Sequence, residues 1–115
     1  MKVAIIGSRN AGKLTVFKIS QHVPADCTQI ISGGATGVDS LAEQYARENN
    51  IPFVEVTPDY KIFGRQAPLV RNSKIVELAD KVLAFWDYQS KGTAHTISEC
   101  VRLNVPFEII SLANE

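Results

Sequence analysis

Residues 30–56 read IISGGATGVDSLAEQYARENNIPFVEV, and this stretch decides the expected fold. Five apolar side chains recur at the spacing of one buried helical face: Val38, Leu41, Ala42, Tyr45 and Ala46. They predict a helix over residues 38–49, which Ile51-Pro52 ends before the next apolar run begins. A strand, a glycine-rich loop, a helix and a second strand in this order predict a βαβ unit with parallel strands.

The rest of the chain repeats this alternation of short apolar runs and helical stretches. Five runs rich in Val, Ile and Phe lie at residues 3–6, 29–31, 53–56, 82–86 and 107–110. Most of them do not alternate with polar residues, so we expect strands that are buried on both faces of a parallel sheet. Further helices are expected at about residues 12–22, from Pro68 onward and over residues 93–103.

Apolar stripes indicate which helix faces are buried. The helix that starts near Pro68 carries Leu69, Ile75, Val76 and Ala79, and the last helix carries Ala94, Ile97 and Val101. The sequence therefore predicts one α/β domain over residues 1–115, with three layers: about five parallel strands and helices on both faces of the sheet.

Charge balance argues against two classes of partner. The 12 basic and 12 acidic side chains cancel, so no global field attracts nucleic acid or an anionic membrane. The nearest basic cluster is thin and consists of Lys61, Arg65, Arg71 and Lys74. We therefore expect that nucleic acid is not a partner. No apolar run approaches the roughly 18 residues that a membrane span needs, and no signal peptide is recognised, so we expect a cytoplasmic protein.

The cysteines and histidines predict no metal site. Cys27 and Cys100 lack the CxxC spacing of a redox or metal pair, and His22 and His95 lie far apart. We expect the cysteines to be reduced packing residues.

Polar and glycine-rich loops follow the predicted strands. They read GSRNAG after the first strand, SGGATGVD after the second, TPDYKIFGRQ after the third and WDYQSKGT after the fourth. Because the carboxyl ends of parallel strands meet at one edge of the sheet, these loops are expected to form a ligand site there.

The first loop resembles a nucleotide-hydrolase phosphate loop but lacks one part of it. Gly7 and Gly12-Lys13 are spaced as in G-x-x-x-x-G-K-[ST], but Leu14 stands where the Mg²⁺-binding hydroxyl belongs. Thr15 lies about 100° further around the helix and does not replace it. A strand-to-helix turn is the alternative. Arg9 follows the strand directly, where its guanidinium would meet a bound phosphate.

The second loop has the composition of an anion site. Ser32, Gly33 and Gly34 end the strand, and the two glycines would let a ligand approach the backbone closely. Gly37 opens the helix, whose free N–H groups favour an anion. Asp39 in the first turn would repel a phosphate, so it suits a sugar hydroxyl or a structural role at the helix start.

Two more segments add polar groups to the same edge. Ser90 and Thr93 offer hydroxyls around Gly92, and Thr93 is expected to be the N-cap of the last helix. Asn72 falls on an apolar stripe, so its amide is expected either to tie down a neighbouring loop or to contact ligand. Arg71 is either a solvated charge or a bidentate phosphate binder.

Three co-ordered motifs, SGGATGVDSLA, APLVRNSKIVELAD and SKGTAHTISE, follow a GSR first strand. In this order and spacing the chain resembles the SLOG superfamily, Rossmann-like domains that bind nucleotide-derived ligands. The best match is its YspA-type, cpYpsA-related branch, with more distant likeness to the DprA/Smf proteins and the LOG-type phosphoribohydrolases. The resemblance implies a site at the sheet edge that contains Gly7, Ser8, Arg9, Gly33, Gly34, Gly37, Asp39, Arg71, Asn72, Gly92 and Thr93. Gly12-Lys13 would then be incidental.

Two departures separate the chain from its relatives. Phosphoribohydrolases carry a glutamate three residues after the threonine of a GGxGTxxE motif, whereas this position holds Thr96 and Glu99 lies one helical turn further on. Pro68 stands where YspA-type sequences more often have glycine.

The leading hypothesis is a binding or sensor module for a nucleotide, an ADP-ribose-like compound or a related phosphosugar, with no other cofactor. The alternatives are a nucleoside 5′-monophosphate phosphoribohydrolase, which would need Glu99, Asp87 or Asp39 as acid or base, and DprA-like binding of single-stranded DNA. Phe17, Tyr60 and Phe63 have no place in the core pattern. We therefore also expect a homo-oligomer, most simply a two-fold dimer.

Overall fold

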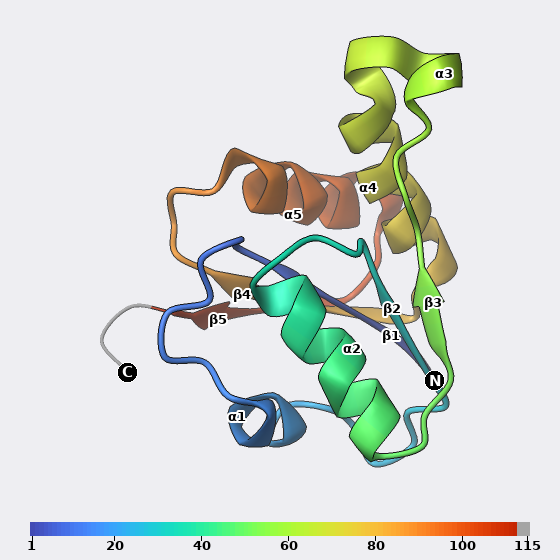
Figure 1. Cartoon of the computed structure of the whole chain (residues 1–115). Helices are drawn as coiled ribbons and strands as arrows, with labels where there is room; N and C mark the ends of the chain where they lie inside the picture. The colour runs from blue at the N-terminus through green and yellow to red at the C-terminus, as the bar shows by residue number, and fades with distance from the viewer. Residues whose placement is uncertain (113–115) are drawn as a thin grey trace.

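A five-stranded, all-parallel sheet forms the centre of the computed structural model, which describes residues 1–112 (Figure 1). The strands are β1 (Lys2–Gly7), β2 (Gln29–Ser32), β3 (Phe53–Glu55), β4 (Lys81–Trp86) and β5 (Phe107–Ser111). Their order across the sheet is β3-β2-β1-β4-β5, with β1 in the middle. The predicted α/β class and all five strands are therefore confirmed, with boundaries that differ by a residue or two.

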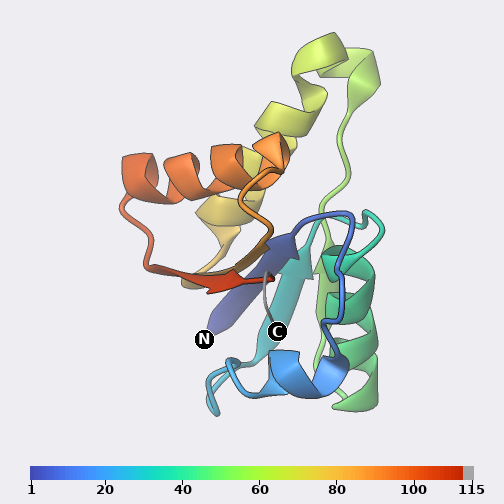
Figure 2. The same cartoon turned by 90° about the vertical axis from the view of Figure 1, so that its left-hand side faces the viewer.

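Helices cover both faces of this sheet. They are α1 (Val16–Ser20), α2 (Val38–Glu48), α3 (Tyr60–Phe63), α4 (Ala67–Leu78) and α5 (Lys91–Leu103), with a 3₁₀ turn, η1 (Gly64–Gln66), before α4. Helices α1 and α2 lie on one face, and α4 and α5 lie on the other (Figures 1 and 2). Within residues 1–112 no helix is long and apolar enough to cross a membrane.

Alternation along β1 divides the core into two clusters. Val3 and Ile5 pack with α1 and α2, while Ala4 and Ile6 pack with α4 and α5. All four side chains are buried, because successive residues of a strand point to opposite faces and both faces are covered here. This explains why the strand is apolar throughout.

The later strands are added on both sides of β1. From β1 it runs outward through β2 to β3, then returns to the other side of β1 for β4 and β5. The strand order therefore reverses between β1 and β4, which is where open α/β sheets bind ligands. The loops after β1 and β4 begin side by side, because Gly7 at the end of β1 pairs with Phe85 near the end of β4.

Several predicted details are wrong. Helix α1 is shorter than the helix expected over residues 12–22. Helix α3 and the turn η1 form in a segment that was expected to be a loop, and this segment extends beyond the helical layer (Figures 1 and 2). Val101 is 66% exposed rather than buried. Helix α5 instead buries Thr93, Thr96 and Cys100, because it packs against α4 as well as against the sheet. Leu69 is also exposed, at 40%.

Candidate functional site

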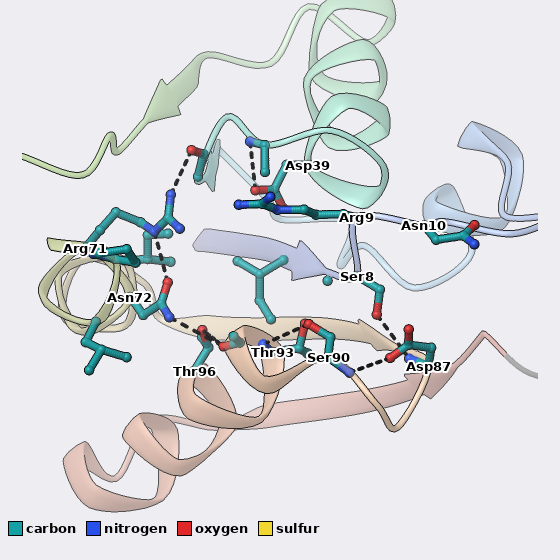
Figure 3. Close-up of a pocket in the computed structure, with 18 residues that line it drawn as sticks. Ser8, Arg9, Asn10, Asp39, Arg71, Asn72, Asp87, Ser90, Thr93 and Thr96 are labelled. Atoms are coloured by element: carbon teal, nitrogen blue, oxygen red, sulfur yellow. Dashed lines mark hydrogen bonds between the residues drawn. The ribbon is translucent and has the colours of Figure 1, made fainter. Parts of the chain in front are cut away.

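A pocket of about 430 Å³ lies at the carboxyl edge of the sheet, between the loops that follow β1, β2 and β4 and the start of α4 (Figure 3). Most of the predicted site residues line it: Gly7, Ser8, Arg9, Gly33, Asp39, Arg71, Asn72, Ser90, Gly92 and Thr93. The pocket therefore brings together four segments that lie far apart in the sequence. Ser32, Gly34 and Gly37 do not line it.

These three residues have structural roles in the turn and the sheet instead. The buried Ser32 hydroxyl donates to the carbonyl of Ile5 on the neighbouring strand (2.6 Å). Gly34 has φ +76°, and a Cβ there would lie 2.5 Å from the Glu55 carboxyl carbon. Gly37 has φ +75°, and a Cβ there would collide with the Arg9 backbone. Of the two glycines expected to let a ligand approach, Gly33 lines the pocket and Gly34 does not, and the positive φ values of Gly34 and Gly37 show that the turn itself requires glycine there.

The first N–H group of α2 is bound within the fold. The first N–H of the helix, that of Val38, donates to the carbonyl of Ser8 (3.1 Å). Asp39 occupies the next position, and its Oδ2 accepts the N–H of Ala35 (3.1 Å). A phosphate at this helix start would meet the Asp39 carboxylate, which disfavours the anion site that the sequence predicts at α2.

Helix α5 presents its N-terminus to the pocket. Ser90, not Thr93, is the N-cap: its Oγ accepts the N–H of Thr93 (3.4 Å) as well as the Thr93 hydroxyl (3.1 Å). The N–H groups of Lys91 and Gly92 have no acceptor in the part of the chain that the structure describes. A Cβ on Gly92 would meet no atom within 4 Å, so the backbone here is open to an anion.

Asp87 holds the loop that leads into α5. Its Oδ1 accepts the N–H groups of Gln89 (2.9 Å) and Ser90 (2.8 Å), and these bonds lower the pKa of the carboxyl. Its own N–H donates to the hydroxyl of Ser8 (3.2 Å), which joins the loops after β1 and β4 (Figure 3). Asp87 therefore shapes the side of the pocket that the start of α5 forms.

Arg71 and Asn72 act as a pair at the start of α4. Arg71 donates from Nη1 to the carbonyl of Gly33 (3.0 Å) and from Nε to Oδ1 of Asn72 (2.9 Å). Asn72 Nδ2 lies 3.4 Å from the carbonyl of Gly92 and 3.3 Å from Nδ1 of His95. Of the two predicted roles, the amide therefore fulfils the structural one, and Arg71 is not merely solvated (Figure 3).

Asp39 is the most unusual group in the pocket. The residue is only 6% exposed, and its Oδ1 is a buried atom with no hydrogen-bond partner among residues 1–112. Burial raises the pKa of the carboxyl, although the N–H of Ala35, the hydroxyl of Ser32 and the charge of Arg71 oppose that rise. An unpartnered buried oxygen costs stability in the ligand-free protein.

Arg9 supplies an available cation. Its side chain is exposed and lines the pocket, and no hydrogen bond or ion pair of it is found in residues 1–112. Beyond it the chain turns away: Asn10 Oδ1 accepts the N–H of Gly12 (3.0 Å), and Lys13 does not line this pocket. The Gly12-Lys13 pair is thus outside the site, as the resemblance implies.

Glu99 lies outside the pocket. It accepts the hydroxyl of Ser73 (2.5 Å) and two guanidinium N–H groups of Arg102 (2.7 and 3.0 Å). These bonds, chiefly the one from Arg102, lower the pKa of the carboxyl to about 2. Thr96 does line the pocket, but its hydroxyl donates to the carbonyl of Gly92 (3.0 Å).

The binding site predicted from the sequence lacked further pocket residues: Ile6, Asn10, Ala35, Pro68, Leu69, Ile75, Thr96, and Asp87, which was considered only as a catalytic acid or base. Asp87 was open to detection, because it directly follows a strand as Arg9 does. The other residues line the pocket because of the direction in which their side chains point, and the pattern of residue types does not show that direction. Among residues 1–112 there is no cluster of three or more His, Cys, Asp or Glu that suits a metal ion.

Comparisons with known proteins agree with this geometry. The model of a family described as the YspA, cpYpsA-related SLOG family matches residues 1–63. The gene 61 protein of Mycobacterium phage D29 is 32% identical over 83 residues, which make up 67% of this chain and 66% of that protein. The X-ray structure of DNA processing protein A (DprA) from Streptococcus pneumoniae matches with a TM-score of 0.73 and 21% identity, over 96% of this chain and 49% of that one. The chain thus spans about two thirds of the phage protein and about half of DprA, and the likeness to DprA shows the fold alone.

Proposed function

The chain belongs to the YspA, cpYpsA-related SLOG family, and on that premise we propose that it binds a nucleotide-derived ligand, such as a nucleotide or an ADP-ribose-like phosphosugar, in the pocket between β1 and β4. The observation that carries the proposal is the open N-terminus of α5. The N–H groups of Lys91 and Gly92 have no acceptor within residues 1–112, and both belong to a 13-residue helix whose dipole favours an anion.

Other groups at this end of the pocket suit a phosphate. The hydroxyls of Ser90 and Thr93 lie beside these N–H groups, and Arg9, which has no partner among residues 1–112, lines the same cavity. Oδ1 of Asp87 already accepts two backbone N–H groups, which offsets part of its negative charge before the ligand arrives. A phosphate would therefore replace water at donors that the fold leaves open.

Binding without hydrolysis is the form of the proposal that Glu99 and Thr96 support. Glu99 is outside the pocket and held by Ser73 and Arg102, so it does not serve as an acid or base on the ligand. Thr96 stands where the phosphoribohydrolases carry glutamate. Incubation with nucleoside 5′-monophosphates should therefore release no free base, and chromatography that detects base would reject this form of the proposal.

Calorimetry tests the binding itself. The panel comprises the adenosine, guanosine, cytidine and uridine 5′-monophosphates and ADP-ribose, each titrated into the full chain. At least one is expected to bind, and Gly92→Leu should abolish its binding, because the new side chain has room in the fold but occupies the margin of the pocket. Circular dichroism would check that the variant is folded.

Arg9→Gln tests the cation, with Arg65→Gln as the matched control. Both changes remove one positive charge from an exposed arginine, but Arg65 does not line the pocket. Loss of a charge-assisted contact should weaken binding by roughly tenfold or more in Arg9→Gln alone. Equal affinities in the two variants, or undiminished binding in folded Gly92→Leu, would place the ligand elsewhere.

A further inference from the structure

One part of the pocket wall is both apolar and exposed. Leu69, in the first turn of α4, lines the pocket and is 40% exposed, and the half-buried ring of Pro68 lines it beside Leu69. Ile6 and Ile75 also line the pocket, but they are only 5% and 1% exposed, so they back the wall from within the core. The surface that a ligand meets on this side is therefore that of Pro68 and Leu69.

The course of α4 explains why Leu69 is exposed. The apolar stripe of this helix runs from Leu69 to Ile75 and Val76, which pack in the core on the sheet. Leu69 itself belongs to neither core cluster of residues 1–112. The start of α4 lies next to the protruding α3 and η1, while the later turns pack on the sheet (Figure 1). The stripe that is buried at Ile75 therefore faces the pocket at Leu69.

This apolar wall lies close to the open start of α5. Asn72 connects the two places, because its Nδ2 lies 3.4 Å from the carbonyl of Gly92. Leu69 precedes Asn72 by three residues, which is about 4.5 Å along the helix axis. A ligand whose phosphate meets the first N–H groups of α5 would therefore extend past Asn72 to Leu69.

Chemistry restricts what can cover the wall. Neither Pro68 nor Leu69 has a hydrogen-bonding group in its side chain, so a phosphate or a sugar hydroxyl placed there would lose water without gaining a partner. In a nucleotide-derived ligand, only the base has a broad face without such groups. Covering exposed apolar surface with that face is favourable, because both surfaces are removed from water.

We infer that the base of the ligand packs on Pro68 and Leu69 while its phosphate binds at the start of α5. The pocket then takes nucleotides in preference to phosphosugars that lack a base. The inference rests on the proposed function, because it needs a phosphate at α5. It assigns affinity for the base to Leu69, a residue that the sequence places in the core.

The first test compares ligands with and without a base. The nucleoside 5′-monophosphate that binds best in the panel above and ribose 5-phosphate are each titrated into the full chain by calorimetry. The nucleotide should bind roughly tenfold or more tightly, because it alone covers the apolar wall. Equal affinities would overturn the inference but leave the proposed function intact. Failure of every nucleoside monophosphate to bind would also overturn it, and if ribose 5-phosphate and ADP-ribose fail as well, the proposed function falls with it.

The second test changes the wall itself. Leu69→Gln replaces an apolar side chain with a polar one, and Val70→Gln is the matched control, because Val70 is 36% exposed on the same helix and does not line the pocket. Leu69→Gln should weaken binding of the nucleotide about threefold or more and leave that of ribose 5-phosphate unchanged. Val70→Gln should change neither affinity.

Folding of both variants is checked by circular dichroism, and Leu69→Ala replaces Leu69→Gln if the latter does not fold. Equal nucleotide affinities in the folded Leu69 and Val70 variants would place the base elsewhere and overturn the inference. An equal loss for the nucleotide and for ribose 5-phosphate in the Leu69 variant would overturn it too, since the change would then act on the pocket as a whole.

Discussion

The side chains of Arg71 and Asn72, adjacent in the sequence, hydrogen-bond each other (Nε to Oδ1, 2.9 Å) and reach two different loops. Arg71 contacts the carbonyl of Gly33 after β2, and Asn72 contacts the carbonyl of Gly92 in the first turn of α5. The pair therefore connects the two sides of the pocket. Because α4 carries both residues, any shift of this helix also moves the site.

Arg71→Ala should lower stability as well as alter the site. It leaves the carbonyl of Gly33 and the Asn72 oxygen without their donor, so the free energy of unfolding in urea should fall by about 1–2 kcal/mol. Arg47→Ala is the control, because Arg47 is exposed and, among residues 1–112, its side chain pairs only with Glu43 one turn away. Its change should stay within about 0.5 kcal/mol. If the two variants are equally stable, the bridge contributes nothing.

Gly34→Val should damage the fold rather than block the ligand. The substitution combines φ +76° with a Cβ 2.5 Å from the Glu55 carboxyl carbon, and Gly34 does not line the pocket. We expect a loss of about 1–3 kcal/mol in urea unfolding, since β-branched residues are strained at this φ. A Gly34→Val protein of unchanged stability would show that the loop adapts.

Glu99 should stabilise the protein in a pH-dependent way. The pKa of the carboxyl falls from 4.5 to about 2 on folding, so its ionised form is favoured in the native state. This stabilisation is complete above about pH 4.5 and is lost as the pH falls toward 2. Glu99→Gln should therefore be less stable than the unmodified chain at pH 7, and the difference should shrink by pH 2.5 in urea titrations. A difference that is independent of pH would exclude this cause.

Exposed apolar side chains support the proposal of a homo-oligomer. Phe17 is 72% exposed, and Tyr60, Ile62 and Phe63 on α3 are 60%, 71% and 43% exposed. Light scattering in the micromolar range should give a mass above the 12.6 kDa of one chain. Ile62→Glu should shift the mass toward one chain if α3 forms the contact, because it places a charge on that surface. A value of 12.6 kDa for the unmodified chain would reject the proposal.

Local sequence determined the layers of this protein. Continuous apolar runs such as 82–86 identified buried parallel strands, and the spacing of Val38, Ala42 and Tyr45 identified α2. Both signals depend only on neighbouring residues, since a strand repeats every two residues and a helix every 3.6. The order of strands and helices also places the loops after β1, β2 and β4 at one edge of the sheet.

Only the tertiary structure decided which groups at that edge are available. The glycine loop predicts an anion site at α2, but Gly34 and Gly37 do not line the pocket and a carboxylate stands in the first turn of α2, whereas Ser90, Gly92 and Thr93 at the start of α5 do line it. In the same way, Asp39 looks in the sequence like an ordinary first-turn carboxylate, yet its Oδ1 is buried without a partner among residues 1–112. The physical reason is that a hydrogen-bonding group is satisfied by whatever lies beside it in space. Residues as far apart as Ser8 and Val38, or Gly33 and Arg71, meet only when the chain has folded.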